Sequence, residues 1–322
     1  MLSIVIPALG RAPTLGRVLE RLARQDVGTD AFEVLIGIDA AERDVASICA
    51  VAGGRPFATR AVQATSPGVS AARNRVWPEA RHEVVLFLGA DMLPAPDLLS
   101  RHLAYHEAHP DPRDALVGHV RWARELKTTP FMRWLDEGMQ FDFGTIDGAR
   151  AAWWHFVAAN ASVKKELLGP AGGFDERFRF GYEEMDLAYR LNELGLRLGY
   201  DPRAEVEHLH PPTLDGWRLR MRLVARAERQ FVSKHADMQP YFLPIFERAA
   251  AAPRLRGRAA RLARFVPRRV PKLGPLVWDH AELWFAQQLA PAFLGAWDEA
   301  GSSAEAGASG AIATPPSSPS VT

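Results

Sequence analysis

The sequence has little cysteine, no long apolar run and almost no net charge. Cys49 is the only cysteine in 322 residues, which excludes a disulfide within the chain and any cysteine-rich zinc site. No stretch reaches the roughly 18 consecutive apolar residues that a membrane-spanning helix needs. A net charge of +1 gives the molecule as a whole no attraction for nucleic acid. We therefore expect a cytoplasmic protein without a nucleic-acid partner, whose contact with a membrane is at most peripheral.

The start of the chain also lacks the features of a secretion signal. No basic region precedes the apolar run Leu2–Ile6, and Pro7 interrupts that run at once. The segment is therefore expected to form a first β-strand that ends at Pro7, and not a signal peptide. The composition, with 48% hydrophobic and 24% charged residues, is ordinary for a globular protein. A chain of this length can hold one large α/β domain and an appendage.

Strands and helices alternate along the first third of the chain. Strands are expected where apolar residues run nearly without interruption, and helices where they recur every three or four residues. The expected strands are Leu2–Ile6, Phe32–Ile38, Phe57–Val62 and Glu83–Leu88, and the expected helices are 15–22, 70–80 and 98–106. The helix over 70–80 should bend or break at Pro78. Continuous apolar strands between amphipathic helices predict a mostly parallel sheet with helices on both faces.

The pattern changes twice further along the chain. Residues 1–213 complete the expected α/β domain, whereas residues 214–298 lose the strand pattern and are expected to form a helical appendage. Residues 299–322 consist largely of Gly, Ser, Ala and Pro, which predicts a disordered tail. The elements expected in the second half of the domain are a strand over Ala115–Trp122, a short helix after Pro130, a strand end and short helix over Asn160–Leu168, a helix over Glu183–Leu194, and short strands over Leu196–Tyr200 and Ala204–His208.

Acidic residues stand at the ends of these elements. Asp39 and Asp91 each follow an expected strand, at the edge where parallel sheets bind ligands. Glu183, Glu184 and Asp186 begin an expected helix. Each position also has a purely structural explanation, because aspartates commonly cap turns and acids in a first helical turn stabilise the helix dipole. Their joint arrangement favours a binding or catalytic site.

At these positions the sequence resembles the inverting enzymes of glycosyltransferase family 2, which have the GT-A fold. The resemblance covers residues 3–211 and consists of six segments in the order of the family. These segments are SIVIPALGRAPTLGRVLERLARQ, EVLIGIDA, SPGVSAARNRV, VLFLGADMLPAPDLL, GGFDERFRFGYEEMDLAYRL and DPRAEVEHLHP. They resemble, in turn, the opening strand and helix, an acidic strand end, the Gly-Val-Ser-x-Ala-Arg-Asn stretch, the Asp-x-Asp segment, the acceptor-side turn with its acidic helix, and a strand that ends in a metal-binding histidine.

The resemblance implies that residues 1–110 bind a nucleotide sugar and that residues 111–213 bind the acceptor. A UDP-sugar is the expected donor, with dTDP- and GDP-sugars as alternatives. The acceptor would be a lipid-linked saccharide, a polysaccharide or a small metabolite. Arg73 would brace the donor site by pairing with an acid. The implied donor-site residues are Pro7, Ala8, Asp39, Arg73, Ala90 and Asp91, and the implied acceptor-site residues are Asn160, Gly173 and Phe174.

The resemblance also implies a divalent cation. Mg²⁺ or Mn²⁺ neutralises the charge that develops on a departing nucleoside diphosphate, and both cations prefer oxygen ligands. The implied ligands are Asp91 and His208, with His210 as the alternative to His208. A histidine at a strand end is also often structural. Gly89 stands where the family has the first aspartate of Asp-x-Asp, which removes one contact to the metal or the ribose.

The start of the acidic helix supplies the implied base. Inverting transfer needs a carboxylate that accepts the proton of the attacking hydroxyl, and the family's base corresponds to Glu184. Glu183 would bind the acceptor, or act as the base if the alignment shifts by one residue. Asp186 is expected to pair with Arg190 one turn later and is not assigned to catalysis.

Two other functions compete with sugar transfer. A nucleotidyltransferase would normally carry a glycine-rich loop with a basic residue such as lysine after its first strand, whereas the loop here is ALGRAPTLG, which contains Pro13 and no lysine. A nucleotide-sugar-binding protein without catalysis is favoured by Gly89. Titration with nucleotide sugars, with and without Mn²⁺, would separate these functions.

Positive charge is concentrated in the helical appendage. Residues 254–272 contain eight Lys or Arg and no acid. Basic residues beside aromatic ones are typical of segments that rest on an anionic membrane. We hypothesise a peripheral membrane contact through 254–297, at the inner face of the membrane. The alternatives are a solvated basic face packed against the catalytic domain and an oligomer contact. The aromatic residues that follow the basic segment are Trp278, Trp284, Phe285 and Phe293.

Overall fold

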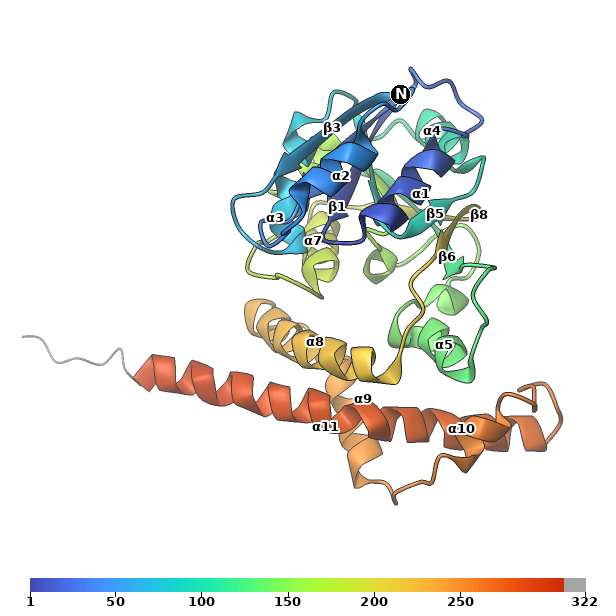
Figure 1. The fold of residues 1–322 in the computed structure, drawn as a ribbon. Coiled ribbons are helices and arrows are strands. Elements are labelled where there is room, and N and C mark those ends of the chain that lie inside the picture. The colour runs from blue at the N-terminus through green and yellow to red at the C-terminus, as the bar shows by residue number, and fades with distance from the viewer. Residues whose placement is uncertain (310–322) are drawn as a thin grey trace, which may run out of the picture. The chain divides into compact units, whose positions relative to one another are not determined.

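The computed structural model describes residues 1–309, and the chain divides into two compact units. The first unit is Met1–Pro212, and the second begins at Thr213. Figure 1 shows the strands of the first unit and the helices of the second. Every strand among the described residues belongs to the first unit, so the candidate site of the acidic residues lies there.

The first unit is built on an eight-stranded sheet with the strand order β3-β2-β1-β4-β7-β6-β8-β5. Its first four strands are all parallel to one another. Their bounds are β1 Leu2–Ala8, β2 Phe32–Ile38, β3 Ala58–Gln63 and β4 Val84–Leu88. β2 and β4 are buried along their whole length, as continuous apolar strands between two helical layers must be. The predicted α/β fold with helices on both faces of its sheet is confirmed.

β1 is longer than predicted. Pro7 pairs with Gly37 of β2 and Ala8 pairs with Ile38, so the proline lies within the strand and does not end it. The pairing of β1 with β4 stops at Val5. The missing N–H of Pro7 therefore removes no ladder hydrogen bond on the side that faces β4.

The second half of the sheet is mixed. β7 is antiparallel to β4 and β6, β8 is parallel to β6, and β5 is antiparallel to β8 at the edge. The two short strands predicted over 196–200 and 204–208 are one strand, because β8 continues along β6 across a register irregularity at Gly118/His119. β5 is too short to show a periodic pattern in the sequence. The bounds are β5 Met92–Pro94, β6 Asp114–Trp122, β7 Asn160–Lys164 and β8 Arg197–His208.

Helices cover the sheet. In Figure 1 α1 and α2 lie side by side, while α3 packs on β1 and β2, and α4 packs on β6 and β8. The helix predicted over 70–80 ends at Asn74, and a 3-10 turn with Pro78 follows. α3 approaches β2 closely because residue 37 is glycine, since a Cβ there would lie 1.8 Å from the carbonyl oxygen of Ala72. The bounds are α1 Ala12–Leu22, α2 Val45–Ala52, α3 Val69–Asn74, α4 Leu98–Ala108, α5 Pro130–Trp134, α6 Lys165–Leu168 and α7 Glu183–Glu193.

The second unit is helical. α11 packs against the other three helices, and its buried aromatic residues include Trp278 and Phe293. α11 continues through residues 299–309, which the sequence analysis assigned to the disordered tail, because alanine favours a helix there. Residues 310–322 of that predicted tail lie outside the described residues. Among the described helices, none is long and apolar enough to cross a membrane. The bounds are α8 Leu214–Lys234, α9 Phe242–Ala251, α10 Arg258–Leu262 and α11 Leu273–Ser309.

Candidate active site

Asp39 connects the end of β2 to the loop that precedes α3. Its backbone N–H donates to the carbonyl of Ala8 at 2.9 Å and so extends the ladder between β1 and β2 by one residue. Its buried carboxylate accepts hydrogen bonds from the N–H groups of Ala41 at 2.8 Å and Gly68 at 2.9 Å. Gly68 has a φ of 123°, a conformation that favours glycine. The aspartate therefore fixes the loop from which α3 begins.

Asp91 lies among three basic side chains. It precedes β5, whose first residue, Met92, pairs with His208 at the end of β8. Asp91 Oδ2 accepts a hydrogen bond from Arg11 Nη1 at 2.9 Å and lies 3.4 Å from His208 Nε2. The other terminal nitrogen of Arg11 lies 3.4 Å from His210 Nε2. The Asp91 carboxylate is therefore in contact with Arg11 of the loop after β1 and with His208 at the end of β8.

These neighbours favour the ionised form of Asp91. Burial raises the pKa of this carboxyl, but the hydrogen bond from His208 and the charges of His208, Arg11 and His210 outweigh it and hold the pKa below its ordinary value. The His208 ring stacks on Trp122, with centroids 5.1 Å apart and an interplanar angle of 20°. Its Nδ1 is buried without a hydrogen-bond partner. Stacking on Trp122 therefore orients the imidazole whose Nε2 faces Asp91.

Arg73 and Glu183 form a buried ion pair between α3 and α7. Arg73 Nη1 lies 3.2 Å from Glu183 Oε1, and the two side chains are only 6% and 8% exposed. Arg73 also donates to the carbonyl of Ala158 at 3.4 Å and lies over the ring of Phe174, 4.9 Å from its centroid. The pair therefore fixes the first residue of α7 to α3 and to the turn that contains Phe174.

Glu184 is linked to the segment that carries Asp91. Its Oε2 accepts a hydrogen bond from the N–H of Ala158. The carbonyl of the next residue, Ala159, accepts a hydrogen bond from the N–H of Gly89 at 3.3 Å. Because Gly89 follows β4 directly, this short connection brings the start of α7 to the carboxyl edge of the parallel strands.

Two residues hold the turn before α7. Asn74 Nδ2 donates to the carbonyl of Phe174 at 2.7 Å, and Asn74 Oδ1 accepts from the N–H of the same residue at 3.0 Å. Arg190 donates to the carbonyl of Gly173 at 2.8 Å. Arg190 also donates to Asp186 at 2.7 and 3.0 Å, which is the pairing that the sequence predicted. The Asp186 carboxylate is therefore hydrogen-bonded to a residue of its own helix.

A family model described as "Glycosyltransferase like family 2" matches residues 1–227. The chain belongs to this family. The predicted membership of glycosyltransferase family 2 is thereby confirmed, and the matched residues include every acidic position described above.

The curated relatives of this chain are distant. Validoxylamine A glucosyltransferase of Streptomyces hygroscopicus subsp. jinggangensis (strain 5008) is 26% identical over 278 residues, which are 74% of this chain and 62% of the relative. Uncharacterized glycosyltransferase YfnE of Bacillus subtilis (strain 168) is 24% identical over 246 residues, 60% of this chain and 61% of the relative. The chain therefore spans about three fifths of the length of these relatives.

Solved structures share the fold of this glycosyltransferase. Mannosyltransferase PcManGT from Pyrobaculum calidifontis, in complex with GDP-Man and Mn²⁺, has a TM-score of 0.57 at 21% identity, over 97% of this chain and 80% of that one. S. aureus TarS 1-349 in complex with UDP has a TM-score of 0.53 at 15% identity, over 92% of this chain and 91% of that one. At these identities the likeness shows the fold alone. The predicted GT-A fold is confirmed.

Two possible metal ligands lie together at the end of β8. Within residues 1–309, no group of three or more His, Cys, Asp or Glu could hold a metal ion. The Asp91 carboxylate and His208 Nε2 nevertheless lie 3.4 Å apart, a separation at which both can bind one cation at ordinary ligand distances. These two donors fit a partial shell, because Mg²⁺ and similar ions keep several waters and take substrate phosphate as further ligands.

The other predicted donor-site residues lie beside this cluster. Pro7 and Ala8 are the last residues of β1, and Ala90 directly precedes Asp91. β1, β2 and β4 are parallel, so these residues share one edge of the sheet with Asp39. Ala8 is buried, whereas Pro7 and Ala90 are half-buried. The predicted donor-side residues other than Arg73 therefore lie at the ends of three neighbouring strands. Arg73 lies on α3.

The predicted acceptor-side residues are placed differently. Asn160 is fully buried, and its amide nitrogen donates to the carbonyls of His119 at 3.2 Å and Ala204 at 2.8 Å. Its amide oxygen lies 3.1 Å from His102 Nε2. An amide whose donors and acceptor are all used inside the protein has no group left for a ligand. The Asn160 side chain is therefore engaged by hydrogen bonds within the core in this structure.

Gly173 and Phe174 shape the acceptor-side turn from within. Phe174 is buried beneath Arg73 and packs edge-on against Phe87. Gly173 has a φ of 68°, and a Cβ there would lie 2.6 Å from the indole nitrogen of Trp77. The two residues that the sequence assigned to acceptor contact thus lie under the surface of the turn.

Two residues of the site were missed in the sequence. Arg11 reaches Asp91 across 80 residues of sequence, and no local pattern reveals such a pairing. Burial raises the pKa of Asp136 to about 7, although a hydrogen bond with Trp122 opposes the shift. Trp122 is the ring on which His208 stacks. Asp136 therefore lies near the end of β8 that carries His208, and its carboxyl has a pKa in the neutral range.

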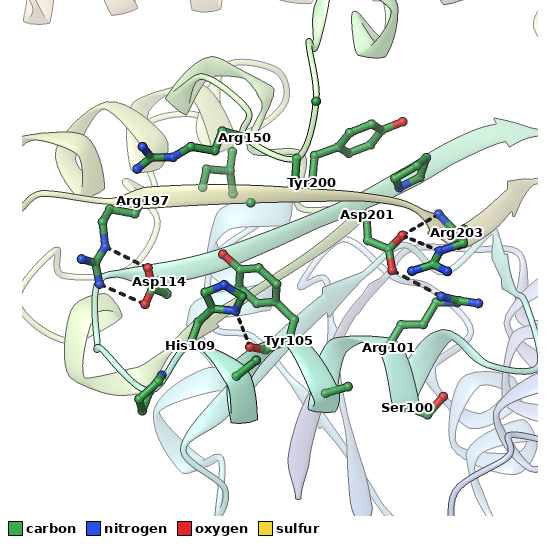
Figure 2. Close-up of a pocket in the computed structure, with 18 of the residues that line it drawn as sticks. Ser100, Arg101, Tyr105, His109, Asp114, Arg150, Arg197, Tyr200, Asp201 and Arg203 are labelled. Atoms are coloured by element: carbon green, nitrogen blue, oxygen red, sulfur yellow. Dashed lines mark hydrogen bonds and ion pairs between the residues drawn. The ribbon is translucent and has the colours of Figure 1, made fainter.

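A wide hollow lies elsewhere on the first unit (Figure 2). It has a volume of about 1330 Å³ and is lined by the start of β8, whereas His208 stands at the other end of that strand. Most of its charged groups neutralise one another, as Arg197 and Asp114 do at 2.8 Å. None of the predicted site residues lines it. We therefore assign the hollow no part in binding the donor or activating the acceptor.

Proposed function

We propose that this chain transfers a sugar from a nucleotide-sugar donor to a hydroxyl group of an acceptor, with inversion at the transferred carbon. The observation that carries the proposal is the hydrogen-bonded connection from Glu184 through Ala158 and Ala159 to Gly89. It supports a catalytic carboxylate at the same edge of the sheet as the donor-side residues. Family membership supports the class of reaction.

Glu184 is the proposed base. Its carboxylate would accept the proton of the acceptor hydroxyl while the hydroxyl oxygen bonds to the anomeric carbon and the bond from that carbon to the diphosphate breaks. A single displacement of this kind inverts the configuration. Glu183 is less suited to this role, because its Oε1 already faces the Arg73 guanidinium at 3.2 Å. We assign Glu183 and Arg73 to positioning Glu184.

Asp39, Asp91 and Arg11 are the proposed polar contacts of the donor. We propose that Asp91 and His208 hold Mg²⁺ or Mn²⁺, which when bound would neutralise the leaving diphosphate. Arg11 supplies a positive charge beside the same carboxylate. The Mn²⁺ and GDP-Man of the PcManGT complex support a metal and a nucleoside diphosphate. The TarS complexes with UDP and UDP-GlcNAc support a UDP-sugar as the donor.

The acceptor and the place of action belong to the same proposal. We propose a saccharide, lipid-linked or small-molecule acceptor and a cytoplasmic site of action, with a peripheral membrane contact through 254–297. The name of the Streptomyces relative supports glucose as the transferred sugar to test first. Incubation with UDP-glucose, UDP-GlcNAc, GDP-mannose and a dTDP-sugar, followed by detection of the released nucleotide, tests the donor.

The role of Glu184 is tested by Glu184→Gln, which keeps the shape of the side chain and removes its basicity. We expect kcat to fall by about 10²- to 10⁴-fold, the usual contribution of a general base. Donor affinity measured by calorimetry should stay within about twofold, because Glu184 has no proposed donor contact. Glu193→Gln, at the exposed far end of the same helix, is the matched control and should keep full activity. Normal turnover by Glu184→Gln would show that another group is the base.

A second candidate is a nucleotide-sugar-binding protein without catalysis. Gly89 favours it, because the family's first Asp-x-Asp carboxylate is missing there. Calorimetric titration of the donor panel, with and without Mn²⁺, separates the two functions. Donor binding without release of the nucleotide, in the presence of Mn²⁺ and a range of acceptors, would support the inert protein and overturn the transferase.

A further inference from the structure

The turn between α10 and α11 displays a group of apolar side chains. Phe265 is 81% exposed, more than any other large hydrophobic side chain among the described residues. Leu262 just before the turn, and Leu273 and Leu276 at the start of α11, are each at least half exposed. Single exposed apolar residues are common on protein surfaces, but a group of them marks a surface that binds an apolar partner.

The backbone holds Phe265 in this exposed position. The N–H of Phe265 donates to the carbonyl of Leu262 at 2.8 Å, and the buried Trp278 donates its indole N–H to the carbonyl of Val266 at 2.9 Å. Gly274 of α11 lies directly against the turn, where a Cβ would come within 2.2 Å of the carbonyl oxygen of Arg268. These contacts fix the turn to α11. The exposure of the ring is part of the fold of this unit.

Positive charge surrounds the apolar group. All eight Lys and Arg residues of 254–272 are exposed, and the segment contains no acid. Arg268 is paired with Glu282, and its guanidinium lies over Trp278. Arg261 and Arg264 flank Leu262 and Phe265 in the sequence. The partner of this surface must therefore offer negative charge and apolar volume together.

Two other partners fit less well. A second copy of the chain would bring two sets of eight positive charges together, which repel. A nucleic acid offers phosphates, but it has no apolar layer to bury aliphatic side chains such as Leu262, Leu273 and Leu276. An anionic bilayer offers both, because basic residues bind its headgroups while Phe and Leu enter the acyl boundary.

We propose that the α10–α11 turn (Figure 1), with the exposed Phe265 and the exposed arginines of the same segment, docks the protein on an anionic lipid membrane. This inference specifies the residues of the peripheral contact and the lipid class. It does not depend on the transfer reaction, so failure of one proposal leaves the other standing. The first variant is Phe265→Ser, which removes the most exposed apolar side chain of the turn. The second neutralises Arg261 and Arg264 together by Arg261→Gln and Arg264→Gln.

The test is sedimentation of the full chain with vesicles of phosphatidylcholine alone or mixed with phosphatidylglycerol, at low and high salt. We expect binding only to the mixed vesicles and a decrease at high salt. Phe265→Ser should weaken binding about tenfold or more, because a buried Phe side chain is lost. Each neutralised arginine should weaken it about fivefold, so that the double variant loses about 25-fold.

Matched controls come from exposed residues outside the turn. Leu219→Ser on α8, where the side chain is 69% exposed, should leave binding unchanged. Neutralising the exposed Arg21 and Arg24 of the first unit should also leave it unchanged. Equal circular dichroism spectra establish that the variants fold. The proposal is overturned if the wild-type chain stays in the supernatant with anionic vesicles, or if Phe265→Ser and Leu219→Ser bind equally well. Binding to single-stranded DNA that matches or exceeds the vesicle binding would overturn it in favour of a nucleic-acid surface.

Discussion

Breaking the Arg73–Glu183 pair should destabilise the first unit strongly. The perturbation is Glu183→Gln, which keeps the volume of the side chain but leaves the Arg73 charge without a counter-ion in a site where the two side chains are only 6% and 8% exposed. Removing one partner of a buried ion pair typically costs about 3–5 kcal/mol. A domain is stable by only about 5–15 kcal/mol, so this loss is a large share of the total.

Urea unfolding followed by circular dichroism measures the effect. With a typical dependence of about 2 kcal/mol per molar urea, the midpoint should fall by about 2 M. Glu79→Gln is the matched control, because Glu79 pairs with Arg60 and Arg75 on the exposed surface at 2.6 and 2.5 Å. A surface pair contributes at most about 1 kcal/mol, so the loss of both pairs should lower this midpoint by no more than about 1 M.

A variant without either charge completes the experiment. Arg73→Met combined with Glu183→Met should recover most of the lost stability, because no uncompensated charge stays buried. It should not recover activity, because both residues are assigned to the site. If Glu183→Gln unfolds at the wild-type midpoint, the pair does not stabilise the fold. Glu183 would then be free to serve as the acceptor ligand or base, and the assignment to Glu184 would lose its support.

Three further outcomes follow from the same structure. Gly37→Ala should cost about 3 kcal/mol or more in urea unfolding, because its Cβ would lie 1.8 Å from a backbone carbonyl of α3. Burial lowers the pKa of His102 to about 4 and that of His106 to about 3, so the folded state keeps both neutral while the unfolded chain takes up protons below about pH 6.5. The two histidines should therefore each lower the free energy of unfolding by about 1.4 kcal/mol per pH unit as the pH drops from 6.5 toward 4, while Asp136, whose raised pKa lets the folded state bind a proton in the same range, offsets about one of them. Arg11→Ala should strengthen Mn²⁺ binding to the donor-free protein by up to about fivefold in calorimetry, because a half-exposed cation no longer competes for Asp91.

Each of these outcomes has a control or a contrary result. Gly144→Ala, where a Cβ would meet nothing within 4 Å, should leave the urea midpoint nearly unchanged. A flat free energy of unfolding between pH 6.5 and 4 would show that the two histidines are not held neutral by burial. Mn²⁺ binding that weakens in Arg11→Ala would show that Arg11 supports the cation site and does not compete with it.

The buried strands could be predicted from the sequence because their physical requirement is strict. β2 and β4 are covered on both sides and therefore appear as unbroken apolar runs. Elements whose form depends on distant partners could not be predicted in the same way. β5 has three residues and exists by pairing with the end of β8, and Pro7 is accepted in β1 because β4 no longer pairs there. α2 is short and shows little amphipathic pattern, so it was not predicted.

The same distinction applies to the candidate site: residues in local motifs could be predicted, and residues that depend on distant partners could not. The sequence predicted that Asp91 and His208 would share one location and that Arg73 would pair with an acid, and the structure has both contacts. Those residues follow strand ends or lie in recognisable motifs. Asn160 satisfies its amide with groups 41 to 58 residues away, and Arg11 approaches Asp91 across 80 residues of sequence. Such contacts depend on the assembled sheet, which no local pattern in the sequence encodes.

The hydrogen bonds of Asn74 have a consequence for altering acceptor choice. Asn74 binds the main chain of residue 174 through both ends of its amide, and Arg190 holds the carbonyl of residue 173. Asn74 Nδ2 also donates to the Glu176 carboxylate at 3.2 Å, whereas the exposed Arg177 bonds Asp175 and not the two anchoring residues. Position 177 can therefore be randomised in a library while Asn74, Glu176 and Arg190 keep the backbone of the turn beside α7.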